Sequence, residues 1–204
     1  MSTTLTMKIL QEQINELKEK IAALESSKKI NNIPSGLGIG DTFDIAGLTW
    51  KILDITAEGY MCLADKLTDK MTFDEKSNDW VKSQLREYLN TEFIEKIADE
   101  IGEENIISFN RNLISLDGQT EYGECGDKVS LLTVDEYRKN RSLIPNTDDY
   151  WWWLVTPWST PCNDYETSVA VVAPAGFINC GVCYRLIGVR PVCIFSSLIF
   201  ESEE

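Results

Sequence analysis

Apolar residues near the N-terminus recur at alternating intervals of three and four positions, at Met7, Leu10, Ile14, Leu17, Ile21 and Leu24. This period of about 3.5 residues, with Met or Ile at the a positions and Leu at d, is typical of a left-handed coiled coil. It favours a parallel dimer, with a trimer as the alternative. Because an isolated helix this short is marginal in water, it needs a packing partner. We expect residues 1–28 to form an oligomerisation helix that joins copies of the chain through residues 7–24, rather than a helix folded back on its own domain.

The composition changes after this helix. Pro34, Gly36, Gly38 and Gly40 interrupt any regular pattern and predict a linker over residues 29–40. Strand and helix patterns begin at Asp41, so we assign residues 41–204 to one globular domain.

Strands are predicted at the start of this domain. Polar and apolar residues alternate over residues 42–45 and 48–53, on either side of Ala46-Gly47, which is the pattern of a β-hairpin. Residues 60–64 follow a Glu-Gly turn and predict a third strand.

The spacing becomes helical over residues 77–97, where Asn90-Thr91 is expected to break and recap the helix. Residues 130–132 predict a short strand, and residues 133–136 have the S/T-x-x-E form of a capping box that opens a short helix. Beyond Trp151 the pattern indicates strands and loops, with a hairpin through residues 173–176. Helices in the middle and β-structure at both ends predict an α+β fold.

Acidic residues outnumber basic ones by 33 to 19, which gives a net charge of −14. Nucleic acids and anionic membranes favour clustered Lys and Arg, so the charge argues against both as partners. No stretch approaches the ~20 apolar residues of a membrane helix, and the N-terminus lacks the basic and apolar regions of a secretory signal. We therefore expect no nucleic-acid binding and no membrane insertion.

The chain has no histidine and six cysteines. The missing histidine removes the commonest general base and the commonest metal ligand. Cys180 and Cys183 have the C-x-x-C spacing of a redox dithiol or a zinc half-site, but their surroundings indicate strand and turn, and no second ligand pair accompanies them. We expect free thiols, no metal, no cofactor and no enzymatic activity.

Tryptophans and one arginine are expected to form the framework. We place Trp50, Trp80 and Trp152 in the core, with Trp151 and Trp153 on the opposite face of their strand from Trp152. Arg190 is expected to be buried and hydrogen-bonded rather than a ligand group.

Several segments then occur in a fixed order: Ile39-Gly40-Asp41, WKILD at 50–54, WVKSQLREYLN at 80–90, WWL at 152–154 and GVRP at 188–191. This set resembles a domain family of gut bacteria and their phages that carries G-D, W-x-V-L-D, W-x-x-S-x-L-R-x-x-L-N, W-W-L-R-S-P-G and G-V-R-P. The resemblance covers nearly all of residues 39–195. Each motif is weak alone, and their order makes the set specific.

That family looks like the formylglycine-generating-enzyme branch of the C-type-lectin fold, in which a terminal G-[FV]-R-x-V strand returns beside the N-terminal strand. Some of its members are variable proteins of diversity-generating retroelements, in which error-prone reverse transcription rewrites a C-terminal segment at adenines. The resemblance implies a C-type-lectin-like domain with a variable region at about residues 151–195. It also implies non-enzymatic binding of a protein or surface ligand, in a phage virion or the bacterial cytoplasm.

The chain departs from the family form after Trp152-Trp153-Leu154, where Val155-Thr156-Pro157 replaces Arg-Ser-Pro. Several positions that are rich in Asn and Ser in the family carry other residues here. Mutation of Asn codons at adenines can produce these residues, and ordinary drift in a surface loop is the alternative explanation. Their mix of aromatic and small polar groups suits adaptable contacts. The expected contact residues are Trp158, Ser159, Thr160, Cys162, Asn163, Asp164 and Tyr165 in one loop, and Phe177, Asn179, Cys180, Val182, Tyr184, Arg185 and Leu186 in the following hairpin and loop.

Two other functions remain open. The chain could be a structural or adhesive component of a phage tail without diversification. It could also be an oxidase of the formylglycine-generating type, or a redox enzyme that uses Cys180 and Cys183. Neither a recognisable copy of the copper-holding cysteine motif nor the E-P-N, Q-P-D and W-N-D triplets of calcium-dependent sugar binding occurs in the sequence.

Overall fold

The computed structural model describes residues 7–8, 10–18, 20 and 33–201. Those between 7 and 20 are helical, and their apolar side chains Met7, Leu10, Ile14 and Leu17 are exposed. Ile21 and Leu24 lie outside the described residues, so association through residues 7–24 stays a prediction. Among the described residues, no helix combines the length and the apolarity needed to cross a bilayer.

Part of the predicted linker belongs to the globular domain. Residues 29–32 lie outside the described residues, whereas Ile33 and Leu37 pack against the domain core. Gly40 N–H donates to Ile52 O at 2.8 Å, and Gly38 N–H donates to the Asp41 carboxylate at 2.8 Å. Residues 33–40 therefore belong to the domain, and the boundary predicted at residue 41 was too late.

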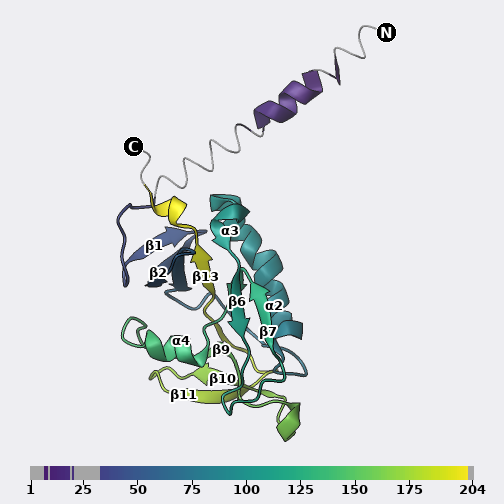
Figure 1. The fold of residues 1–204 in the computed structure, drawn as a ribbon, viewed down its shortest axis with the longest axis vertical. Coiled ribbons are helices and arrows are strands. Elements are labelled where there is room, and N and C mark those ends of the chain that lie inside the picture. The colour runs from purple at the N-terminus through teal and green to yellow at the C-terminus, as the bar shows by residue number, and fades with distance from the viewer. Residues whose placement is uncertain (1–6, 9, 19, 21–32, 202–204) are drawn as a thin grey trace.

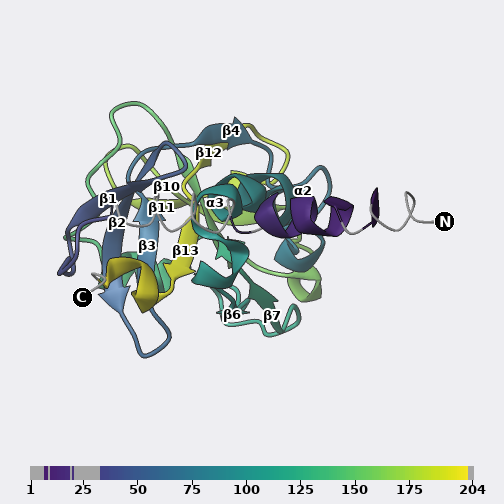
Figure 2. The same ribbon diagram turned by 90° about the horizontal axis from the view of Figure 1, so that it is seen from above.

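Two sheets organise the domain (Figure 1). The first has the order β1 (Thr42–Ile45), β2 (Leu48–Ile55), β3 (Tyr60–Ala64), β13 (Val192–Phe195) and β5 (Ile106–Ile107), with β8 (Val129–Ser130) also paired to β13. The second has the order β11 (Ile178–Val182), β10 (Ser168–Val172), β9 (Trp152–Pro157), β12 (Ile187–Val189) and β4 (Asp69–Met71). The ribbon of β6 (Phe109–Asn112) and β7 (Glu124–Asp127) stands apart from both. Figure 2 shows β3 beside β13, and β4 beside β12.

The predicted hairpins are confirmed. β1 and β2 pair antiparallel around Ala46 and Gly47, whose φ values of 56° and 70° are those that a tight two-residue hairpin turn requires. β10 and β11 pair antiparallel on either side of residues 173–177.

The central helical segment consists of η1 (Trp80–Lys82), α2 (Gln84–Tyr88), the π-helical turn η2 (Leu89–Phe93) and α3 (Ile94–Ile101). The predicted break at Asn90-Thr91 is wrong, because the chain passes through it as a π-turn without leaving the helix. This wider turn lets Leu89 and Phe93 both stay buried. The structure therefore keeps one nearly continuous helical rod where a break and a new cap were expected.

The second predicted helix, α4 (Val134–Lys139), begins with the expected capping box. Thr133 Oγ1 accepts from Glu136 N–H, and the Glu136 carboxylate accepts from Thr133 N–H at 2.8 Å. Together with the sheets, these helices confirm an α+β fold.

β9 is buried on both faces, because each face packs against a separate part of the core. Trp153 and Val155 face the larger core, which includes side chains of α2 and α3. Trp152 and Leu154 face a second core that contains Tyr137 of α4. Trp152 is structural, as predicted, but Trp153 is equally buried, and Trp151 is the exposed member of the triplet at 37%.

The last strand returns to the N-terminal sheet, although not beside the first strand. β13 pairs with β3, so that β2 and β3 lie between β13 and β1 in the sheet. Figure 1 places β1 and the C-terminal helix η5 (Ser197–Phe200) at one end of the domain and β11 at the other.

Candidate ligand-binding cleft

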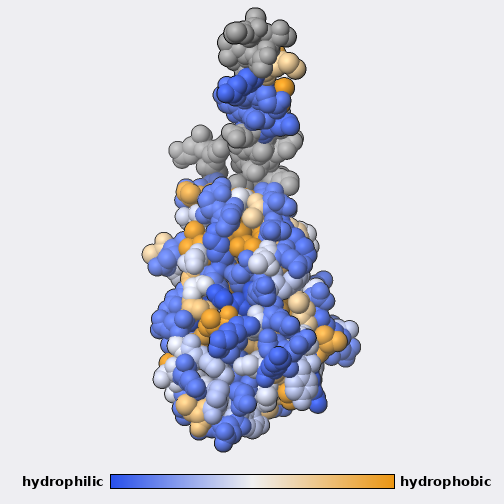
Figure 3. Space-filling model, turned by 90° about the vertical axis from the view of Figure 1, so that its right-hand side faces the viewer, coloured by the Kyte–Doolittle hydropathy of each residue, from blue (hydrophilic) through white to orange (hydrophobic). Residues whose placement is uncertain are grey.

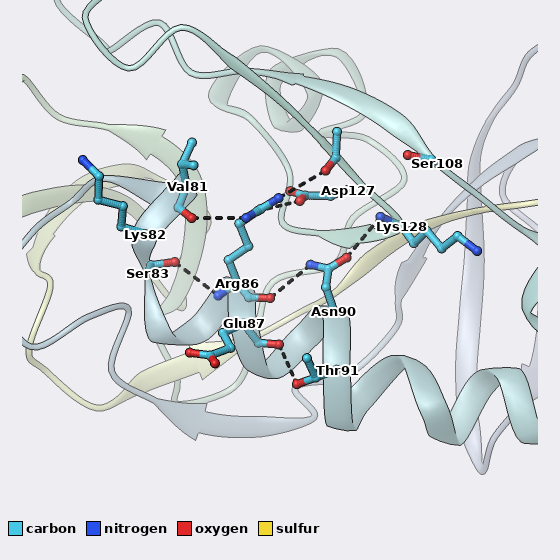
Figure 4. Close-up of a pocket in the computed structure, with 11 residues that line it drawn as sticks. Val81, Lys82, Ser83, Arg86, Glu87, Asn90, Thr91, Ser108, Asp127 and Lys128 are labelled. Carbon is cyan, nitrogen blue, oxygen red and sulfur yellow. Dashed lines mark hydrogen bonds and ion pairs between the residues drawn. The ribbon is translucent and has the colours of Figure 1, made fainter.

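Hydrogen bonds join residues 80–90 of the helical segment to the β7–β8 region (Figure 4). We call this network, which is centred on Asp127, the Asp127 lock. The Asp127 carboxylate accepts from Trp80 Nε1 at 2.7 Å and from Arg86 Nε at 2.6 Å. Arg86 also donates to Val81 O and Gly126 O. A buried carboxylate that accepts hydrogen bonds from an arginine and a tryptophan holds both side chains firmly in place.

Asn90 completes this lock from the π-turn (Figure 4). Its amide donates to Val129 O at 2.8 Å and accepts from the backbone N–H groups of Lys128 and Val129. A hollow of about 500 Å³ lies beside these residues. Because Arg86, Asn90 and Asp127 are occupied by bonds within the chain, we assign this hollow to the framework and not to a ligand.

Arg190 is a second fixed point, as predicted. It is 1% exposed, donates to Ala64 O and Asp65 O, and lies 4.9 Å from the ring centroid of Trp152. Burial lowers the pKa of Arg190 to about 10. Its bonds join the segment after β12 to the end of β3.

A cleft of about 490 Å³ opens at the end of the second sheet. Its apolar wall comes from the segment before β9, from β10 and from the segment that leads into β12. Its polar groups include two cations, one carboxylate, one amide, the Tyr150 hydroxyl and the Cys180 thiol. Such a mixture, at this size, is typical of ligand sites. The lining residues are Lys70, Asp149, Tyr150, Trp151, Val171, Asn179, Cys180, Gly181, Arg185, Leu186, Ile187 and Gly188.

Two aromatic contacts hold the walls of this cleft. Trp151 and Phe177 meet edge to face, with ring centroids 5.6 Å apart. The Lys70 ammonium lies over the Tyr150 ring, 3.9 Å from its centroid. Rings fixed in this way lose little freedom on binding, which favours tight contacts.

The predicted contact residues of the hairpin and the following loop are at the surface, and four of them line the cleft: Asn179, Cys180, Arg185 and Leu186. Phe177 is 54% exposed, Tyr184 59% and Leu186 71%, whereas Val182 is only partly exposed. Large apolar side chains exposed together mark interaction sites more often than single ones do.

The predicted contact residues of the first loop fall into two kinds. Ser159 and Thr160 are buried, so their assignment as contacts is wrong. Ser159 Oγ donates to Asp117 at 2.6 Å, and Asn163 Nδ2 donates to the same carboxylate at 2.9 Å. A hydrogen bond from Ser115, followed by these two from Ser159 and Asn163, lowers the pKa of Asp117.

The rest of this loop is at the surface, away from the lining of the cleft. Cys162, Asn163, Asp164 and Tyr165 are exposed, and Trp158 is half-buried. Trp158, Asn163 and Tyr165 border a separate hollow of about 260 Å³. Asp164 has φ 53° and ends the short helix η4 (Pro161–Asn163), so it also shapes the turn.

Sequence reasoning missed eight of the twelve residues that line the cleft, and the charged or aromatic ones among them are Lys70, Asp149, Tyr150 and Trp151. The signal for Tyr150 and Trp151 was their position directly after Asp148-Asp149, because a polar stretch keeps adjacent rings near solvent. Lys70 gave no signal, since it reaches the cleft only through the pairing of β4 with β12.

The thiols do not form a reactive pair in this structure. All six cysteines are free. Cys180 lies on β11, and burial raises the pKa of Cys183, which is the opposite of what a redox dithiol needs. The part of the chain that the structure describes holds no group of three or more Cys, Asp or Glu side chains placed to bind a metal ion.

Two sheets, the helices packed with them and an aromatic cleft lined by strands of the second sheet define an α+β domain with a candidate ligand site. Residues 57–197 match a protein family, the Domain of unknown function (DUF6273). The match covers more than half of the chain, so the chain belongs to this family. No curated protein and no solved structure matches it.

Proposed function

We propose that the chain is a non-enzymatic binding protein, a variable protein of a diversity-generating retroelement, that presents contact residues on a C-type-lectin scaffold. The observation that carries this proposal is the exposure of Phe177, Tyr184 and Leu186, which lie just before and just after β11, the neighbour of the fully buried strand β10. Exposed apolar side chains of this size bring a free chain no stability and suit a partner.

The framework and the proposed contact surface use different atoms. The lock around Asp127 and the bonds of Arg190 involve none of the contact residues. Substitution at Phe177, Tyr184 or Leu186 therefore removes no framework hydrogen bond. This separation is what a scaffold needs if its surface is to vary while its fold persists.

The arrangement of the domain suits display. Figure 1 shows β1 at one end of the domain and β11 at the other. If residues 7–24 join copies of the chain, several clefts act together, and effective concentration multiplies a weak single-site affinity.

The rest of the surface agrees with a protein whose contacts are local. Figure 3 shows one face of the molecule, on which hydrophilic residues predominate and hydrophobic ones form small, separate spots. A net charge of −14 also discourages non-specific association between copies.

The genomic locus tests the proposal. We expect a template repeat beside a reverse-transcriptase gene, differing from the coding stretch for residues 151–195 only at adenines. The differing codons should be those of exposed residues such as Tyr165, Phe177 and Tyr184, and not those of Trp152 or Trp153. A complete locus without such a repeat, or differences spread over the buried codons, would contradict diversification.

A further inference from the structure

The second sheet ends in a strand that has a partner on one side only. Among the described residues, β11 pairs with β10 and with no other strand. An unpaired strand edge offers a row of backbone donors and acceptors to another chain.

The two edges of this sheet differ in how they discourage pairing. β4, at the far edge, has three residues, of which Asp69 and Lys70 are charged and exposed. β11 has five residues, Ile-Asn-Cys-Gly-Val, with no charge and no proline. Short length and charge are the usual protections of an edge strand, and β11 has neither.

The outer edge of β11 keeps free backbone groups. Within the described part of the chain, no backbone hydrogen bond outside the β10 ladder involves Ile178 or Cys180. The Cys180 N–H donates to its neighbour's side chain, Asn179 Oδ1, at 2.8 Å. A side-chain amide can rotate away at little cost, which would release this donor to an incoming strand.

The aromatic cleft reaches this edge. Asn179, Cys180 and Gly181 of β11 belong to its lining, together with Trp151. A strand added beside β11 would direct alternate side chains to the cleft face. In strand addition, main-chain bonds supply affinity and a neighbouring pocket supplies selectivity.

Charge decides which strand fits. A second copy of this chain would bring another net charge of −14 to the interface, which opposes pairing of two β11 edges. A basic segment is attracted by this charge instead, and a neutral one meets no repulsion. Lys70 and Arg185 at the cleft oppose a cationic side chain inside it, and Asp149 opposes an anionic one. Because Trp151 and Leu186 offer apolar contact, the residue that enters the cleft should be apolar.

We propose that β11 is the docking strand for an extended, neutral-to-basic segment of a partner protein, which inserts an apolar side chain into the aromatic cleft. This inference rests on the proposed binding function and specifies its partner class.

Selection from a displayed library of eight-residue peptides tests the proposal, with the full chain as bait. Enriched peptides should carry alternating apolar residues and no excess of acidic ones. In a synthetic copy of an enriched peptide, N-methylation of the amides along one edge should weaken binding about tenfold or more, because several strand hydrogen bonds are lost. Methylation along the other edge should leave binding unchanged.

Alkylation of cysteines provides the matched readout on the protein. A saturating peptide should slow alkylation of Cys180 several-fold and leave Cys162 unchanged, because Cys162 is exposed on the other loop, outside the cleft lining. The proposal is overturned if no peptide is enriched, if both methylation patterns act equally, or if Cys162 is protected instead of Cys180. A dimer that forms through β11 in sedimentation would overturn it in favour of self-pairing.

Failure here is distinguishable from failure of the proposed function. If peptide selection fails while the template repeat is found, the chain remains a diversified binding protein whose partner is not an extended strand. If the repeat is missing from a complete locus, diversification fails whether or not peptides bind.

Discussion

Trp151 and Phe177 meet edge to face, with ring centroids 5.6 Å apart, although 26 positions separate them in the chain. One ring precedes β9 and the other lies in the turn of the β10–β11 hairpin. The contact joins the framework strand to the proposed variable hairpin. Both rings are still more than a third exposed, so they support each other and leave surface for a ligand.

Neighbouring tryptophans should therefore differ in what they do. We expect Trp153→Ala to destabilise the domain by about 3–5 kcal/mol, because it empties a fully buried site. Trp151→Ala should cost about 1 kcal/mol or less while weakening binding of a selected peptide at least tenfold. Urea unfolding and titration of the two variants measure both effects. A large stability loss in Trp151→Ala would move this ring from the binding site to the framework.

The Asp127 lock should contribute strongly to stability. Asp127→Ala leaves Trp80 Nε1 without its buried acceptor and Arg86 without its counter-ion, so we expect a loss of about 3 kcal/mol. Asp135→Ala is the matched control, because its ion pair with Arg138 is at the surface and should contribute less than about 1 kcal/mol. Equal midpoints of urea unfolding for the two variants would contradict a strong contribution of the Asp127 lock to stability.

Arg190 should not tolerate lysine. The guanidinium donates to two separate carbonyls and lies over the Trp152 ring, a combination that a single ammonium cannot reproduce. We expect Arg190→Lys to lower stability by about 2 kcal/mol, measured as the shift of the thermal midpoint. A midpoint within about one degree of the parent chain would show that an ammonium group replaces the guanidinium of Arg190 without loss.

Much of this framework could be predicted from the sequence. Two-residue alternation around Ala46-Gly47 identified the first hairpin, and the S/T-x-x-E pattern identified the start of α4, because both depend on neighbouring residues. The buried role of Arg190 followed from its place in an apolar strand segment. The pairing of β13 with β3 rather than β1 was not foreseen, since register between distant strands depends on the whole core.

The site was harder to predict for the same reason. The comparison with the resembled family's form predicted Phe177, Tyr184 and Leu186 as contact residues, and they are exposed. Ser159 and Thr160 were misassigned because small hydroxyl residues suit both a contact loop and a buried hydrogen bond, and Asp117, which lies far away in sequence, holds Ser159 inside. Lys70 joins the cleft only through long-range strand pairing.

Alkaline pH should destabilise the domain through its buried thiols. Burial, with the nearby Asp127 charge, raises the pKa of Cys125 to about 11, and burial raises those of Cys62 and Cys193 well above their usual value. A thiol in the unfolded chain ionises near pH 8.5. Above that pH these three thiols therefore lose their protons in the unfolded state while they keep them in the folded state. Stability is therefore complete below about pH 8.5 and declines as the pH rises toward about 11.

Urea midpoints at pH 8 and pH 10.5, under reducing conditions, measure this decline. Cys125→Ala should show a smaller loss between the two pH values than the parent chain, because one contributing thiol is gone. Identical losses in the two proteins would assign the alkaline sensitivity to other groups.

The central claim is that the fold tolerates nearly any side chain on the proposed contact surface. Two randomised libraries test it most directly, one at Cys162, Tyr165, Phe177, Tyr184, Arg185 and Leu186, and the other at the buried positions Trp152, Leu154, Val155 and Ala170. Thermal midpoints of sampled members are then measured. The account predicts that most surface variants melt within about 5 °C of the parent chain and that most buried variants fail to fold. Surface variants that unfold as often as buried ones would contradict it.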